Sequence, residues 1–215
     1  MASQASSLEP GPAVKKVLIF GHSYARDLEA LGDWDTVVTG GEGKEYRLTF
    51  DFRSFPGKDY GWLLEHPEKI EEVKDLDPDI VVVILGGNSI TAALTNKQIC
   101  GQAAEFYELL KAAAKPSCLK LAVQVESRYV PQGNYHRAPP AAEFNRRRTI
   151  INNFVNRKLR AKGLVDYMIL LGGHGHIIHP SNFSPRDGVH LVRVVLMRYK
   201  QTLMNGIRYA LGHRL

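Results

Sequence analysis

Residues 79–85 read DIVVVIL, and Gly86, Gly87 and Asn88 follow them directly. This apolar and largely β-branched run has the length and composition of a strand that is buried on both faces. Such strands are typical of a parallel sheet that is covered by helices on each side. The run therefore predicts the centre of an α/β fold.

Similar segments lie on both sides of this stretch. Residues 14–20 (VKKVLIF) form a second apolar run that ends at a glycine, and residues 36–39, 119–125 and 165–171 predict further strands. Residues 45–52 alternate apolar and polar side chains, so they fit either a strand or an extended loop.

Segments with helical spacing of apolar residues alternate with the strands. They are residues 23–31, 59–76 with a break at Pro67, 96–114, 141–162 and 191–211. Alternating strands and helices are typical of a parallel sheet with crossover helices. We therefore predict an α/β fold, a single-domain three-layer α/β/α sandwich with a mainly parallel, flavodoxin-like sheet.

The composition of the 215 residues, 44% hydrophobic and 23% charged, is that of an ordinary soluble protein. Residues 1–13 are rich in small residues and proline, so we expect a flexible segment without a secretory signal, followed by one domain over residues 14–215. No apolar run reaches the roughly 18 residues of a membrane span. With only Cys100 and Cys118, we expect free thiols and an intracellular, cytoplasmic location. Nothing in the sequence indicates an oligomeric state.

Four short motifs stand after predicted strands or before a helix. They are Gly21-His22-Ser23 after the first strand, Gly57 after residues 45–52, Gly86-Gly87-Asn88 after residues 79–85, and Asp187-Gly188-Val189-His190 before the last helix. The turns after parallel strands meet at one edge of a sheet. The ordered set G-x-S, a lone Gly, G-x-N and D-x-x-H resembles the SGNH (GDSL-like) hydrolase superfamily over about residues 15–211.

Longer stretches are similar to one branch of that superfamily. GHSYARDL, DPDIVVVILGGN, QVESRY and RDGVHL resemble SGNH domains of invertebrate genomes, many of which are associated with LINE retrotransposons. Two positions depart from the usual pattern, since His22 and Ser89 each stand where the family has Asp. The first departure could reorganise hydrogen bonds beneath the site, and the second could loosen the turn that holds Asn88. Both leave room for weakened or lost activity.

The resemblance implies a role for each motif. A serine hydroxyl needs a general base to become a nucleophile, and imidazole titrates near neutral pH. Ser23 is the expected nucleophile, His190 the base, and Asp187 the residue that orients the imidazole. The N–H groups of Ser23 and Gly57 and the amide of Asn88 would bind the oxyanion. The implied function is a serine esterase that hydrolyses small acyl or acetyl esters through an acyl-enzyme, without a cofactor.

A basic segment indicates a second possible function. Arg146, Arg147, Arg148, Arg157 and Lys158 predict a basic helix, and the net charge of +6 favours anionic partners. The alternative is a non-catalytic or weakly active SGNH-like module that binds RNA or a protein partner through this surface. The simpler interpretation is a solvated helix face, because no aromatic residues suggest base stacking.

Three histidines close together in sequence raise the question of a metal. His174, His176 and His179 could supply imidazole ligands, but their segment contains no carboxylate. We therefore expect a polar loop near the rim of the site and no metal.

Overall fold

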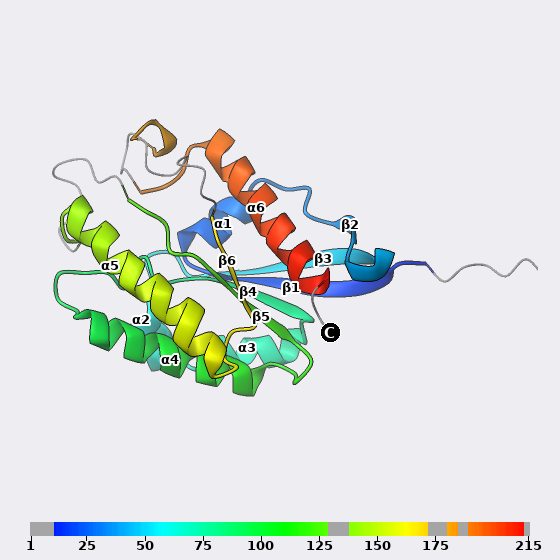
Figure 1. Ribbon diagram of the computed structural model, residues 1–215, viewed down its shortest axis with the longest axis horizontal. Helices are drawn as coiled ribbons and strands as arrows, with labels where there is room; N and C mark the ends of the chain where they lie inside the picture. The colour runs from blue at the N-terminus through cyan, green and yellow to red at the C-terminus, as the bar shows by residue number, and fades with distance from the viewer. Residues whose placement is uncertain (1–10, 129–137, 172–179, 185–188, 213–215) are drawn as a thin grey trace, which may run out of the picture.

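The computed structural model describes residues 11–128, 138–171, 180–184 and 189–212, and a six-stranded sheet forms its centre (Figure 1). The strands are β1 (Ala13–Gly21), β2 (Thr36–Thr39), β3 (Glu45–Ser54), β4 (Ile80–Ile84), β5 (Leu119–Val123) and β6 (Tyr167–Ile169). Their order is β2-β3-β1-β4-β5-β6, in which β2 pairs antiparallel with β3 and all other neighbours are parallel. The predicted mainly parallel sheet is confirmed.

The central strands are buried on both faces, as their apolar sequences predict. Every residue of β4 and β5 is buried, and β1 is buried over its second half. Residues 45–52, which fit a strand or a loop in the sequence, belong to β3. This strand pairs with the whole of β1, from Ala13 opposite Tyr46 to Gly21 opposite Ser54.

Helices cover both faces of the sheet (Figure 1). One face carries α1 (Ser23–Glu29) and α6 (Arg193–Gly212), and the other carries α2 (Tyr60–Glu65), α3 (Glu68–Leu76), α4 (Asn96–Ala113) and α5 (Ala141–Asn153). A hydrophobic core lies on each face of the sheet, and alternate side chains of β4 belong to different cores. Val81 and Val83 pack toward α4, while Val82 packs toward α6. The three-layer α/β/α sandwich is confirmed.

Smaller elements complete the chain. The helix predicted for residues 141–162 continues past α5 as a π-helical segment, η2 (Phe154–Leu159), and two 3₁₀ turns are η1 (Gly41–Gly43) and η3 (Pro180–Asn182). Within the described part of the chain, no helix combines the length and hydrophobicity that crossing a membrane requires. Cys100 and Cys118 are free, as expected.

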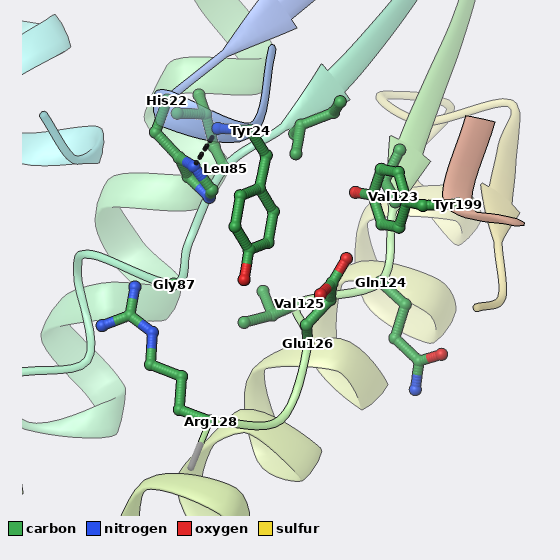
Figure 2. A pocket seen from close by; sticks show the side chains of 11 residues that line it. His22, Tyr24, Leu85, Gly87, Val123, Gln124, Val125, Glu126, Arg128 and Tyr199 are labelled. Atoms are coloured by element: carbon green, nitrogen blue, oxygen red, sulfur yellow. Dashed lines mark hydrogen bonds between the residues drawn. The ribbon is translucent and has the colours of Figure 1, made fainter. Parts of the chain in front are cut away.

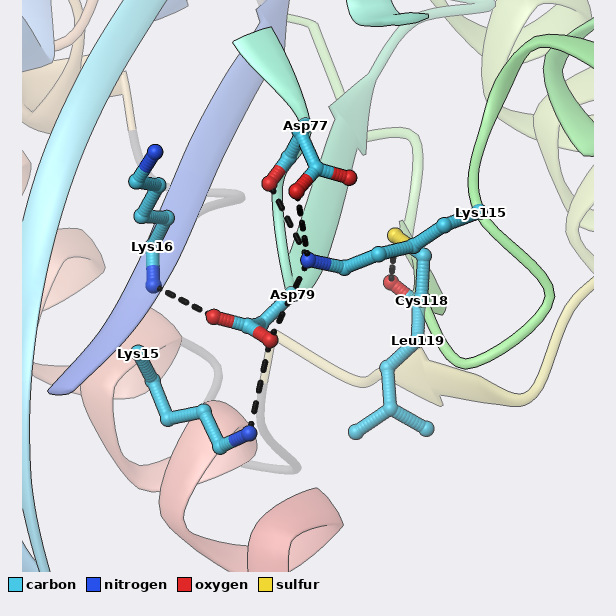
Figure 3. Close-up of polar contacts among 7 residues, drawn as sticks. All are labelled: Lys15, Lys16, Asp77, Asp79, Lys115, Cys118 and Leu119. Atoms are coloured by element: carbon cyan, nitrogen blue, oxygen red, sulfur yellow. Dashed lines mark hydrogen bonds and ion pairs between the residues drawn. The ribbon is translucent and has the colours of Figure 1, made fainter. Parts of the chain in front are cut away.

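The two ends of the sheet carry different side chains. From the end of β1 the chain goes to β3 on one side and then returns to β4 on the other, so the winding direction changes at the carboxyl ends of β1 and β4. Open α/β sheets bind ligands at such a switch point. Polar side chains line a small cavity there (Figure 2), whereas a charged cluster holds the opposite, amino ends together (Figure 3).

Asp79 joins three strands at their amino ends (Figure 3). Its carboxylate accepts the N–H of Lys16 at 2.9 Å and forms ion pairs of 3.4 Å with Lys15 and Lys115. Its own N–H donates to the Lys16 carbonyl, and its carbonyl accepts the N–H of Leu119, both at 2.9 Å. Burial opposes ionisation of the carboxyl group, but the Lys16 N–H and the two ammonium groups outweigh burial, so the pKa of Asp79 is lowered.

We predict that Asp79→Ala lowers the free energy of unfolding by about 1–2 kcal/mol at pH 7, because it removes a half-buried acceptor and its ion pairs. Since the folded pKa is lowered, the ionised carboxylate stabilises the fold above its unfolded pKa of about 3.9, and this contribution is lost as the pH falls through the folded value. Urea unfolding at pH 7 and pH 3 measures the difference, with the exposed Asp75→Ala as control. A deficit of equal size at both pH values would contradict the ionic contribution.

Candidate active site

Ser23 and His190 meet at the carboxyl edge of the sheet although 167 positions separate them in the sequence. The Nε2 atom of His190 lies 2.9 Å from the Oγ atom of Ser23. Ser23 is the first residue of α1, directly after β1, and His190 stands shortly before α6. A hydroxyl in hydrogen-bond contact with an imidazole is the arrangement that general-base activation of a serine requires.

The position of Ser23 follows from the way β1 ends. The N–H of His22 donates to the carbonyl of Ile84 at 3.1 Å, which continues the contact between β1 and β4. A Cβ atom on Gly21 would overlap the backbone of Ile84, so this close approach requires glycine. The chain then turns directly into α1, and the serine stands on the first turn of the helix.

His22 caps α1 through its side chain. Its Nδ1 atom accepts the N–H of Tyr24 at 3.4 Å, which is the contact an Asp at this position would also make. Burial lowers the pKa of His22 to about 3, and the positive charge of Arg128 adds to the shift. The imidazole is therefore neutral at physiological pH and can act as an acceptor. The first departure from the SGNH pattern keeps the helix cap and removes a buried charge.

Gly57 lies in a turn that packs against the end of β1. The N–H of Phe55 donates to the carbonyl of Gly21 at 2.8 Å, and the N–H of Lys58 donates to the carbonyl of Phe55 at 3.1 Å. Pro56 and Gly57 occupy the two central positions, and Gly57 has a φ of +75°. This combination is that of a type II turn, in which the second central residue favours glycine. The turn is held beside the N-terminus of α1.

Two neighbouring groups fix the side chain of Asn88. Its Nδ2 atom donates to the carbonyl of Lys58 at 3.0 Å, and its Oδ1 atom accepts from the guanidinium of Arg128 at 2.8 Å. The first contact connects the Asn88 turn to the Gly57 turn. Because the Oδ1 atom is occupied by Arg128, the amide nitrogen stays oriented toward the neighbouring turn.

The turn around Asn88 stays closed with Ser89 in place of Asp. The N–H of Ser89 donates to the carbonyl of Gly86 at 3.2 Å, and its hydroxyl accepts the N–H of Tyr60 at 3.4 Å. Ser89 is completely buried. The loosened turn that this departure could cause is therefore not observed.

Several residues singled out in the sequence lie outside the described part of the chain. Asp187 is one of them, and so are His174, His176 and His179. Among the residues that the structure describes, no cluster of three or more His, Cys, Asp or Glu side chains could hold a metal ion.

The structure adds an acidic residue that the sequence analysis does not single out. The Oδ2 atom of Asp27 lies 3.9 Å from the Nε2 atom of His190. The carboxylate also accepts two hydrogen bonds from Arg26. Asp27 follows Ser23 by four positions, so a helix starting at Ser23 puts both on one face, and this spacing could have indicated the contact.

The proposed basic surface needs a correction. Arg147 is only 6% exposed, and its guanidinium donates to Asn96 and to the carbonyls of Thr91 and Leu94. It therefore braces the segment before α4 and cannot belong to a nucleic-acid surface. The sequence contains the reason, because Arg147 lies three residues after Phe144, on the buried stripe of α5.

The other predicted basic residues differ in exposure. Arg148 is half-buried and donates to the carbonyl of Val125, and Arg146 pairs with Glu143. Arg157 and Lys158 are exposed on η2. The five residues therefore do not form one continuous exposed face.

A buried carboxyl group lies beneath the site. Glu126 is 7% exposed, and neither carboxyl oxygen has a hydrogen-bond partner among the described residues. Burial raises its pKa to about 8, although the nearby Tyr199 hydroxyl and the charges of Arg128 and Arg148 lower the pKa in part. The carboxyl group is therefore mainly protonated at neutral pH. With neutral His22 beside it, the cavity of about 20 Å³ in Figure 2 has two uncharged walls and is large enough for one water molecule.

Comparison with solved structures identifies the fold as that of the GDSL-like, or SGNH, hydrolases, as the sequence predicts. A GDSL-like lipase from Bacteroides thetaiotaomicron superposes with a TM-score of 0.59 and 18% identity, covering 90% of this chain and 87% of that one. An extracellular lipase from Streptomyces rimosus gives 0.60 and 16%, covering 89% and 99%. A family 3 carbohydrate esterase from Clostridium thermocellum gives 0.58 and 16%, covering 93% and 99%. No family model and no curated protein matches the sequence.

We predict that Glu126→Gln stabilises the protein increasingly as the pH rises. The folded pKa lies above the unfolded value, so the folded state retains a proton between pH 4.5 and about 8 that the unfolded chain releases. Stability linked to Glu126 is complete below pH 4.5 and is lost as the pH rises through 8. Glutamine keeps the shape without titrating. Urea unfolding at pH 5, 6.5 and 8 measures the effect, and the exposed Glu108→Gln serves as control. A difference that does not change with pH would contradict the assignment.

Proposed function

We propose that the protein is a serine esterase that hydrolyses small acyl or acetyl esters through an acyl-enzyme intermediate. The observation that carries the proposal is the 2.9 Å contact between the Ser23 hydroxyl and the His190 imidazole at the switch point of the sheet. Ser23 stands at the start of a helix, where N–H groups and the helix dipole favour a developing negative charge.

In the proposed reaction His190 removes the proton of Ser23 while the Oγ atom attacks the ester carbonyl. The oxyanion would be bound by the N–H groups of Ser23 and Gly57 and by the Nδ2 atom of Asn88. The tetrahedral intermediate then collapses, and the departing alcohol takes the proton from His190. A water molecule, deprotonated by His190, hydrolyses the acyl-enzyme and restores the serine. Asp187 is proposed to hold the imidazole and stabilise its cation.

Two further observations support this function. The structural neighbours are named as lipases and a carbohydrate esterase, and their fold is shared by this chain over most of its length. The two departures at His22 and Ser89 leave the helix cap and the Asn88 turn in place. From the resemblance in sequence, we also propose that this esterase is related to the SGNH domains that are associated with LINE retrotransposons.

The nucleic-acid alternative has less support. Arg147 makes internal contacts, which leaves Arg146, Arg157 and Lys158 as the exposed members of the predicted basic surface, and Arg146 is paired with Glu143. Binding to RNA that weakens steeply with salt would favour it.

We predict that Ser23→Ala lowers kcat for 4-nitrophenyl acetate by at least about 10³-fold, because it removes the nucleophile, without lowering the melting temperature. Ser117→Ala, at an exposed serine on the opposite end of the sheet, is the matched control and should retain full activity. Initial rates on both purified variants provide the measurement. Undiminished hydrolysis by Ser23→Ala, or an inactive wild type, would overturn the proposed function.

We also predict that Asn88→Ala lowers kcat by about 10²–10³-fold with little change in KM, because an oxyanion donor acts mainly in the transition state. Asn153→Ala, which removes an exposed amide on α5, is the control. Steady-state kinetics separate kcat from KM. A rise in KM with unchanged kcat would instead assign Asn88 to substrate binding.

A further inference from the structure

Tyr24, the residue after Ser23, contacts the segment that carries His190. Its hydroxyl donates a hydrogen bond to the backbone carbonyl of Val189, which directly precedes His190. Tyr24 is 5% exposed and Val189 is 4% exposed, so this contact is shielded from water. A buried hydrogen bond therefore connects the residue beside the nucleophile with the residue beside the base.

The ring of Tyr24 also lies between three other rings. It makes edge contacts with His22 at a centroid distance of 5.1 Å, with His190 at 6.1 Å and with Tyr199 of α6 at 6.1 Å. Such edge contacts have a preferred geometry and restrict ring rotation. The side chain thus touches the cap of α1, the imidazole that faces Ser23, and the last helix.

Backbone contacts with residues 183–184 also hold the His190 segment. The N–H of Ser184 donates to the carbonyl of His190 at 2.6 Å, and Phe183 forms an isolated bridge with Leu191. These contacts join the segment to Phe183 and Ser184 but not to the nucleophile. The Tyr24 hydrogen bond holds the backbone of this segment against α1, whereas the contacts of His190 with Ser23 and Asp27 involve its side chain.

We propose that Tyr24 is a positioning residue, which holds the His190 backbone at the distance from α1 that brings its imidazole to Ser23. This inference rests on the proposed function, in which His190 acts as the base. Because nucleophile and base must stay within hydrogen-bond reach, a displacement of about 1 Å can lower the rate about 10²-fold. We expect the effect in kcat and not in KM, since Tyr24 is only 5% exposed.

Tyr199 provides a matched comparison. Its hydroxyl lies beside the cavity in Figure 2, near the carboxyl group of Glu126, and makes no hydrogen bond to the His190 segment. Replacing either tyrosine by phenylalanine removes one buried hydroxyl and keeps the ring. Only the replacement at position 24 removes a hydrogen bond to the His190 segment.

The test compares the kinetics of Tyr24→Phe and Tyr199→Phe on 4-nitrophenyl acetate. We expect Tyr24→Phe to lower kcat by about 10–100-fold with KM changed less than about twofold, and Tyr199→Phe to stay within about threefold of the wild type. Equal effects of the two variants, or a Tyr24→Phe effect confined to KM, would overturn the proposal.

A second measurement separates this inference from the proposed function. Nitrogen-15 NMR of histidine-labelled protein, with His190 assigned by His190→Gln, reports on the imidazole without any substrate. Tyr24→Phe should shift or broaden the His190 ring signals, and Tyr199→Phe should leave them in place. Unchanged His190 signals in Tyr24→Phe would refute the positioning role even in an active esterase. Hydrolysis that survives in Ser23→Ala would refute the proposed function independently.

Discussion

The close backbone contact between the ends of β1 and β4 is the constraint on which the site depends. Gly21 lies against Ile84 without room for a side chain, and the N–H of His22 donates to the Ile84 carbonyl. This contact fixes where α1 begins and therefore where the Ser23 hydroxyl stands. The Gly57 turn is anchored on the carbonyl of the same Gly21, so both turns take their position from one residue.

The small cavity beneath the site is lined by polar side chains, and two of them, His22 and Glu126, are uncharged at neutral pH. A neutral imidazole caps α1 in place of a carboxylate, and Glu126 keeps its proton at neutral pH. Arg128 and Arg148 supply positive charge near Glu126, and Arg128 also donates a hydrogen bond to Asn88. Burying neutral forms avoids the cost of an unpaired buried charge. A developing negative charge on the substrate would therefore meet fixed donors without a competing anion in this cavity wall.

Much of the fold was accessible from the sequence because burial of the central strands imposes long apolar runs. The strands β1 and β4 and the glycine motifs after them could be predicted, and so could the meeting of Ser23 with His190 through the resemblance. Periodicity identifies which face of a helix is buried but not what it contacts. The hydrogen bond from Tyr24 to Val189 joins residues 165 positions apart, and no local pattern specifies it.

The burial of Arg147 could have been predicted from its helical spacing, but its positive charge favoured an exposed position instead. A run of three arginines suggests a solvated face, yet the middle one lies on the apolar stripe of α5. Burial of its guanidinium is possible since two carbonyls and an amide oxygen accept its hydrogen bonds. Those acceptors come from the segment before α4, which only the tertiary structure brings to the arginine.

Contact with His190 is proposed to make the hydroxyl of Ser23 nucleophilic. Mass spectrometry of the intact and digested protein after reaction with a fluorophosphonate tests this most directly. We expect a single covalent adduct on the peptide that contains Ser23. An unmodified protein, or an adduct on a different serine, would contradict it.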